Sequence, residues 1–329
     1  MWVVSAGLVR MCRCCLNRQQ CRESDWQLWM SISLIVTGCY RPKADNDGRL
    51  IFTALGSHHL MTLTIWRPEP AVNTRTVKFA SDGYLVIPEL ICEQELAFAR
   101  ELVTELVDRY RGGDPTSISA GVTISEVSQQ HPQRNPGIKQ DRWQREPFII
   151  GDLLALEPRF ARLLIQEPIW TCVGELLECA SSDLLFHFCN LTRKPSKVGP
   201  AIGWHRDADN KYFASHDGRT LRLLIPLHFM SARNGGTAVV SGSHIRTDTP
   251  VETALCPEVA PGACLALHSA TLHGGSPNRS EQERDVIVIQ FGLCSSTLRC
   301  KADETSSLST REELLAFYLG TVEKLIENS

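Results

Sequence analysis

The chain of 329 residues lacks three features that would place it in a large class of proteins. The apolar runs in its first 60 residues, such as residues 32–36 with Ser33 among them, are far below the ~18 residues that a membrane span needs. Lys and Arg number 34 against 37 Asp and Glu, whereas proteins that bind a phosphate backbone need a cationic surplus. The 13 cysteines show no matched pairs at structural-zinc spacing. The sequence therefore favours neither a membrane, nor a nucleic-acid partner, nor a zinc knuckle.

The chain does have the composition of a globular protein, with 43% hydrophobic and 22% charged residues. Residues 1–60 differ from the rest, because they hold five of the 13 cysteines and carry a charge of +3. They show no secretory signal, since their apolar start precedes Arg10 and Arg13. We expect an atypical leader, either a disordered extension or the result of a start assigned too early, with Met61 as the alternative. The other eight cysteines are scattered singly, many among apolar residues, which is typical of reduced thiols in a cytoplasmic protein.

Hydrophobic spacing divides the remainder into helices at its ends and strands between them. Helical spacing is present over residues 93–111 and over 160–177, where Pro168 interrupts the pattern. Residues 112–146 indicate a long loop, which we interpret as a candidate lid over a substrate. The strand patterns are 184–190, 221–229, 237–240, 263–267 and 285–293, and a capping-box pattern precedes a helix over 311–327.

No helix-length segment separates neighbouring strands, so a parallel sheet is disfavoured. The predicted fold is mainly β with flanking helices, a double-stranded β-helix of the jelly-roll, cupin-like kind. One domain over residues 61–300 is expected, with a C-terminal helix at 301–329 packed on it.

Three side chains form a candidate metal site. His205 and Asp207 are two residues apart, and such residues point to the same face of an extended strand. His273 follows 68 residues later, directly before Gly274 and Gly275. Two histidines and one carboxylate on one side of Fe(II) leave the opposite positions open, whereas Zn²⁺ would use the same three groups with a water.

Arg284 stands eleven residues after His273, at the start of a predicted strand. A guanidinium binds a carboxylate through two parallel hydrogen bonds and keeps its charge. It is therefore suited to hold the far carboxylate of a dicarboxylic acid whose other end chelates the metal.

Together these motifs resemble the phytanoyl-CoA dioxygenase family of Fe(II)/2-oxoglutarate-dependent oxygenases. The similar segments are His205-x-Asp207, the turn NGGTAVVSGSH at 234–244, and the spacing His273-x₄-Asn278-x-Ser280-x₃-Arg284. The likeness covers roughly residues 77–293. Ser241 stands where the family usually has Pro, and the polar loop 209–220 is long.

The resemblance implies that His205, Asp207 and His273 hold Fe²⁺, that Arg284 binds the 2-oxoglutarate C5 carboxylate, and that Ser280 assists Arg284. It also implies O₂ as the oxidant, ascorbate as an accessory reductant, and succinate and CO₂ as products. Because the third ligand position holds a carboxylate, Asp207, hydroxylation or a related oxidation is favoured over halogenation. The expected substrate is a small metabolite, either a secondary-metabolism intermediate or a free amino acid.

A cupin-like metal-dependent isomerase or hydrolase with the same triad is the alternative, and a monomer and a homodimer both stay open. Other polar residues have ordinary explanations. His228 and His268 are expected to be packed histidines, and His244 to support its turn. Arg193, Lys194 and Lys197 are interpreted either as contacts to an anionic substrate or as a solvated loop.

Overall fold

The structure is a computed structural model that describes residues 43–44, 50–55, 60–65, 74–113, 124–209, 213–300 and 304–327. The chain separates into two compact units, residues 1–71 and residues 72–329. In the first unit, β1 (Lys43–Ala44), β2 (Leu50–Leu55) and β3 (Leu60–Ile65) form an antiparallel sheet. Most of the predicted leader lies outside the described residues, so its interpretation stays a prediction.

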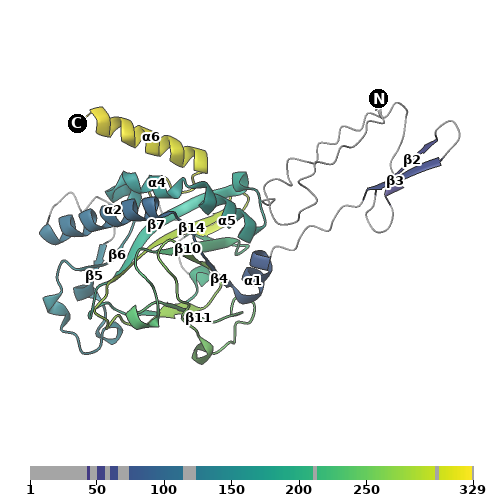
Figure 1. Ribbon diagram of the computed structural model, residues 1–329. Helices are drawn as coiled ribbons and strands as arrows, with labels where there is room; N and C mark the ends of the chain where they lie inside the picture. Colours follow the sequence, from purple (N-terminus) through teal and green to yellow (C-terminus); the bar gives the residue numbers. More distant parts are fainter. Residues whose placement is uncertain are drawn as a thin grey trace, which may run out of the picture. The chain divides into compact units, whose positions relative to one another are not determined.

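The second unit is built on a seven-stranded antiparallel sheet (Figure 1). Its strands, in spatial order, are β4 (Tyr84–Ile87), β12 (Cys264–His268), β10 (Thr220–Pro226), β14 (Arg284–Leu293), β7 (Leu184–Lys194), β6 (Pro147–Ile150) and β5 (Ile124–Glu126). A smaller sheet contains β11 (Thr237–Val239), β13 (His273–Gly275) and β8 (Ile202–His205). A further pair is β9 (Ala214–Ser215) with β15 (Leu298–Cys300).

Helices cover one face of the large sheet, and β11 of the smaller sheet lies on the other side (Figure 1). The helices are α1 (Thr74–Asp82), α2 (Glu93–Gly112), α3 (Leu153–Leu156), α4 (Ala161–Leu164), α5 (Glu167–Leu177) and α6 (Arg311–Glu327). The C-terminal helix packs on α4, with Leu314 fully buried. None of the helices in the described ranges has an apolar stretch of membrane-spanning length.

Alternation along β10 and β14 places the core on one face of the sheet and the site on the other. Leu223 and Ile287 belong to the core beneath the helices, whereas Leu224 and Val286 belong to a second apolar cluster on the opposite side. Successive side chains of a strand point to opposite faces. Arg222 and Arg284, each two residues from a member of the second cluster, therefore face away from the helices.

Most predicted elements are confirmed, with informative differences. The helical region 160–177 splits into α4 and α5, and Pro168 sits in the first turn of α5, where its missing N–H is not needed. The capping box of α6 is formed by Thr310 and Glu313, which exchange side-chain to backbone hydrogen bonds of 2.8 and 3.2 Å.

Two segments depart from the pattern. The helix α1 was not among the predicted elements, and Phe79 is its buried side chain. The predicted long loop 112–146 contains β5 and three short 3₁₀ turns, while residues 114–123 lie outside the described part.

Candidate metal centre

The two histidines of the candidate site are direct neighbours across two paired strands. His205 ends β8 and His273 begins β13, and their Cα atoms are partners in the antiparallel register. Their ring centroids lie 4.2 Å apart. Strand pairing therefore brings together imidazoles that are 68 residues apart in the chain.

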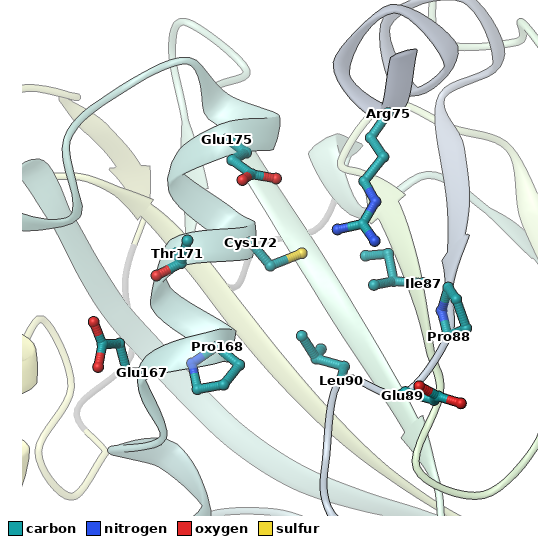
Figure 2. A pocket seen from close by; sticks show the side chains of 10 residues that line it. All are labelled: Arg75, Ile87, Pro88, Glu89, Leu90, Glu167, Pro168, Thr171, Cys172 and Glu175. Atoms are coloured by element: carbon teal, nitrogen blue, oxygen red, sulfur yellow. The ribbon is translucent and has the colours of Figure 1, made fainter. Parts of the chain in front are cut away.

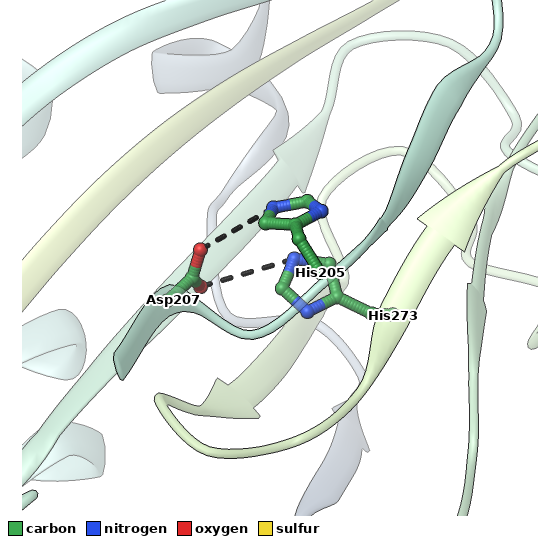
Figure 3. Close-up of side chains that lie close together, drawn as sticks. All are labelled: His205, Asp207 and His273. Carbon is green, nitrogen blue, oxygen red and sulfur yellow. Dashed lines mark ion pairs between the residues drawn. The ribbon is translucent and has the colours of Figure 1, made fainter. Parts of the chain in front are cut away.

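Asp207 completes the cluster from outside the strand. The prediction that His205 and Asp207 share one extended strand is wrong, because β8 ends at His205 and Asp207 opens a 3₁₀ turn over Asp207–Asp209. The carboxylate nevertheless faces both rings, with Oδ1 3.5 Å from Nε2 of His205 and Oδ2 3.8 Å from Nε2 of His273 (Figure 3). One donor atom from each of the three residues lies within 4.8 Å of the others.

Backbone carbonyls fix the protonation of both rings. Nδ1 of His205 is 2.9 Å from the Gly203 carbonyl oxygen, and Nδ1 of His273 is 2.9 Å from that of Thr271. A carbonyl oxygen can only accept, so each Nδ1 carries a hydrogen, and in the neutral ring each Nε2 keeps its lone pair. Both lone pairs are thus on the atoms nearest Asp207, the arrangement expected of metal-binding imidazoles.

The electrostatics of the cluster keep Asp207 ionised although its side chain is 2% exposed. Burial alone would raise the pKa of Asp207, but the charge of Arg222 and the two histidines outweigh it and lower the pKa to about 2. The nearby Asp207 carboxylate raises the pKa of His205, whereas burial lowers that of His273. Neither oxygen of Asp207 accepts a well-aligned hydrogen bond, although Arg222 lies at ion-pair distance. A buried carboxylate left so open is suited to a cation.

A cavity of about 260 Å³ adjoins the cluster and also reaches Arg284. Its walls are formed by Ile149, Phe188, Asn190, Thr192, Ile202, His205, Arg222, Leu224, Thr237, His273, Gly274, Arg284, Val286 and Val288. No Asp or Glu stands among these lining residues. The cavity is thus mainly apolar, with polar groups and two arginines at defined points, as in small-molecule sites.

Arg284 enters this cavity as a buried cation, 1% exposed. Its Nη1 contacts only the Met230 Sδ at 3.5 Å, and Nε and Nη2 are buried without a hydrogen bond. Among the described residues no carboxylate forms an ion pair with it, and burial lowers its pKa to about 10. Such a guanidinium lacks the anionic partner that buried charges normally have.

Ser280 lies elsewhere. Its hydroxyl lies 2.8 Å from Asn278 Oδ1 and 3.0 Å from the Gln282 carbonyl oxygen, either of which can accept its one hydrogen, within the turn that precedes β14. It is not among the residues that line the cavity. The assisting role of Ser280 stays a prediction.

The basic residues before the His-x-Asp segment are not all in a solvated loop. Arg193 and Lys194 are the last residues of β7 and are buried. Arg193 pairs with Glu146, Glu283 and Asp285. Lys194 donates to the carbonyl oxygens of Gly235 and Ser276 at 2.8 and 2.6 Å. For these two residues both earlier interpretations are wrong, since they are structural.

The remaining polar residues of the sequence motifs have local partners. Nε2 of His244 contacts the Ala80 carbonyl oxygen at 3.0 Å, and Nδ1 of His268 accepts from the Ala270 N–H at 3.1 Å. Nδ1 of His228 accepts weakly from the Asp285 N–H at 3.3 Å. Arg206 donates to the carbonyl oxygens of Ser243 and Ala270. These contacts support turns and strand ends, as expected from the sequence for the histidines.

Sequence reasoning missed Arg222, Phe188 and Asn190, which also line the cavity. Arg222 is the only charged residue of the strand TLRLLIP, and a lone cation in an otherwise apolar strand was the available signal. Asn190 has a buried Oδ1 without a partner. Both side chains need the sheet order before they can be assigned to the site.

Two other features of the described residues do not form comparable sites. His228, Glu283 and Asp285 also cluster, but Arg193 already pairs with both carboxylates. A larger hollow of about 400 Å³ lies between α1, the end of β4 and α5 (Figure 2). Its walls carry Arg75 and three glutamates but no histidine, and burial raises the pKa of the Cys172 thiol there to about 12. We therefore assign the chemistry to the smaller cavity.

Relatives of known activity match part of the chain. Ectoine dioxygenase from Sphingopyxis alaskensis is 25% identical over 184 residues, which are 54% of this chain and 52% of that protein. Ectoine dioxygenase from Streptomyces avermitilis is 25% identical over 181 residues, 54% of this chain and 53% of that protein. The chain thus spans about half the length of the curated relatives it matches.

Solved structures show the same fold. EctD from S. alaskensis, with 2-oxoglutarate and 5-hydroxyectoine, has a TM-score of 0.57 at 19% identity, covering 74% of this chain and 89% of its own. The 2-oxoglutarate-dependent carbocyclase SnoK from nogalamycin biosynthesis has a TM-score of 0.54 at 16% identity, covering 70% and 87%. The predicted jelly roll is thereby confirmed.

The family model of phytanoyl-CoA dioxygenase (PhyH) matches residues 79–286. This range includes His205, Asp207, His273 and Arg284, and it covers well over half of the chain. The chain therefore belongs to the phytanoyl-CoA dioxygenase family, as its motifs indicated.

Proposed function

We propose that the protein is an Fe(II)/2-oxoglutarate-dependent dioxygenase that oxidises a small metabolite. The observation that carries this proposal is a single cavity that joins the His205–Asp207–His273 cluster to the unpartnered cation Arg284. Family membership and the structural likeness to oxygenases support it.

The three ligand candidates fit iron by their chemistry. Two Nε2 lone pairs and an ionised carboxylate converge within 4.8 Å, and the carboxylate oxygens have no aligned hydrogen bond. Two histidines and one carboxylate are the donor set of non-haem Fe(II) oxygenases, which leaves positions for other ligands. We assign His205, Asp207 and His273 as the metal ligands.

Arg284 fits the far end of 2-oxoglutarate. A fully buried guanidinium with free N–H groups is costly unless an anion reaches it. A dicarboxylate that extends from the metal into the cavity supplies that anion through charge-assisted hydrogen bonds. The alternative, a cupin-like isomerase or hydrolase, gives Arg284 no comparable role.

When bound, ferrous iron with 2-oxoglutarate and O₂ supplies the oxidising chemistry, and 2-oxoglutarate is converted to succinate and CO₂. The protein positions the reactants and limits the access of water to them. Phe188, Leu224 and Val288 form an apolar wall of the cavity, which excludes solvent from the reacting groups. The substrate must bring its C–H bond to the open side of the cluster.

For the substrate we propose a small metabolite, a secondary-metabolism intermediate or a free amino acid. The cavity of about 260 Å³ must hold both 2-oxoglutarate and the reacting part of the substrate, so it favours a compact reacting group. The carboxylate of Asp207 in the third ligand position favours hydroxylation, desaturation or ring closure over halogenation. Ascorbate is expected only to restore ferrous iron.

The test is O₂-dependent formation of succinate from 2-oxoglutarate with Fe(II). Wild-type protein is expected to form succinate slowly without substrate and faster with the correct one. His205→Ala should abolish the product, whereas His216→Ala, which removes an exposed histidine, should not. Metal-dependent turnover of a substrate without 2-oxoglutarate would favour the isomerase or hydrolase instead.

A further inference from the structure

Arg222 is the second arginine of the cavity, and it points at a metal-ligand candidate. It stands in the middle of β10, paired in register with Gln290 of β14. Its Nη1 lies 2.7 Å from Asp207 Oδ1, and 13% of its side chain is exposed. Unlike Arg284, it has a carboxylate partner in this structure.

The guanidinium of Arg222 is fixed from several sides. Its Nε donates to Gln290 Oε1 at 3.0 Å, and its Cζ lies 5.1 Å from the Phe188 ring centroid. Gln290 is itself held, because its Nε2 donates to the Phe213 carbonyl oxygen at 2.8 Å and lies 3.1 Å from His187 Nδ1. A side chain held by hydrogen bonds and a ring contact can define the position of the group that it touches.

The two oxygens of Asp207 therefore have different surroundings. Oδ1 faces Nη1 of Arg222 at 2.7 Å and Nε2 of His205 at 3.5 Å. His273 approaches the other oxygen, with its Nε2 3.8 Å from Oδ2. The permanently charged Arg222 thus makes its closest approach to the carboxylate at Oδ1.

We propose that Arg222 is a positioning residue that occupies Oδ1 of Asp207, so that Oδ2 alone is presented to the metal. This inference rests on the proposed function and on its assignment of the three ligands. Six positions around the metal minus three protein atoms leave three, two for the chelating co-substrate and one for O₂. A second oxygen from Asp207 would fill one of those three. Arg222 thus keeps the coordination sphere open.

A competing role for Arg222 is that of a nearby charge alone. A cation beside the site repels a divalent metal, so removing it would strengthen metal binding. Removing a positioning residue instead frees Oδ1, so that Asp207 offers the metal a second oxygen and the coordination number changes. The visible spectrum of the bound metal therefore distinguishes the two roles, because a nearby charge alone changes the affinity but not the coordination.

The experiment uses the full chain and Co²⁺ alone as the probe, with affinity measured by titration and coordination by the visible absorption spectrum. Arg222→Met is expected to change the visible spectrum of bound Co²⁺ to that of a higher coordination number, because both oxygens of Asp207 can then bind. Gln290→Leu keeps the charge but frees the guanidinium, so a smaller spectral change in the same direction is expected. Arg222→Lys should restore only part of the wild-type spectrum, because an ammonium lacks the planar fork.

The matched control is Arg162→Met. Arg162 also pairs with a carboxylate, Glu95, and lies over a ring, Phe98, but on the helical layer. Its loss should leave Co²⁺ affinity and spectrum unchanged. Circular dichroism establishes that each variant is folded, and Arg222→Lys with Gln290→Leu decides the question if Arg222→Met does not fold.

An unaltered Co²⁺ spectrum in Arg222→Met and Gln290→Leu, whatever the affinity, would overturn the positioning role while leaving the proposed function intact. A wild-type protein that binds no Co²⁺ would instead overturn the proposed function, and this inference with it.

Discussion

Replacing Arg284 by Met should stabilise the protein without ligand while impairing co-substrate binding. The Arg284 side chain is fully buried, and its Nε and Nη2 have no hydrogen bond. Burial lowers its pKa from 12.5 to about 10, a difference that corresponds to about 3 kcal/mol. Met keeps an unbranched apolar stem in place of the aliphatic part of Arg and carries no charge. We expect the free energy of unfolding to rise by about 1 to 3 kcal/mol.

The same change should weaken 2-oxoglutarate binding strongly. Removing one partner of a buried, hydrogen-bonded charge pair costs about 2 to 5 kcal/mol. At 1.4 kcal/mol per tenfold, this is a loss of affinity between about 30-fold and several thousand-fold. Stability and function therefore oppose each other at this residue.

Urea unfolding of the metal-free protein measures the first effect, and calorimetric titration with 2-oxoglutarate in the presence of Mn²⁺ measures the second. Arg162→Met is the control, because it removes an ion-paired arginine outside the cavity and should not alter 2-oxoglutarate binding. Equal 2-oxoglutarate affinity in Arg284→Met, or a large loss of stability without ligand, would refute the reasoning.

Two further predictions concern the supporting framework. Burial lowers the pKa of His187 to about 4, so the unfolded chain takes up a proton below pH 6.5 that the native state refuses. Stability should fall by up to about 3 kcal/mol between pH 6.5 and 4, and urea unfolding of His187→Gln should show a flatter dependence. Gly235 and Gly218 both have positive φ, but a Cβ on Gly235 would lie 2.5 Å from the Ser276 carbonyl oxygen, and one on Gly218 would meet nothing. Gly218→Ala should cost about 1 kcal/mol for strain and Gly235→Ala at least 1 kcal/mol more, and equal losses would contradict this steric argument.

The sequence predicted the identity of the cluster but not its local geometry. His205, Asp207 and His273 were recognisable because their types and spacing match a motif. The position of Asp207 could not be predicted, because the spacing does not show where the pairing of β8 with β13 ends. β13 pairs with β8 only as far as His205, and Asp207 then turns into a 3₁₀ segment.

Burial of charged residues was the part that spacing could not predict. Arg193 and Lys194 follow the apolar run of β7, and their burial depends on β14 extending the pairing to Arg284. Arg222 looks like an irregularity in an apolar strand until its register partner Gln290 and the neighbouring Asp207 are placed. Long-range pairing, which is set by the whole sheet, determines each of these positions.

The central claim is that this cavity binds Fe(II) and 2-oxoglutarate together. Anaerobic addition of both to the folded protein should produce the weak visible charge-transfer band of their chelate, and His205→Ala should lack it. If the folded wild-type protein gives no band anaerobically and forms no succinate in air, the claim is contradicted.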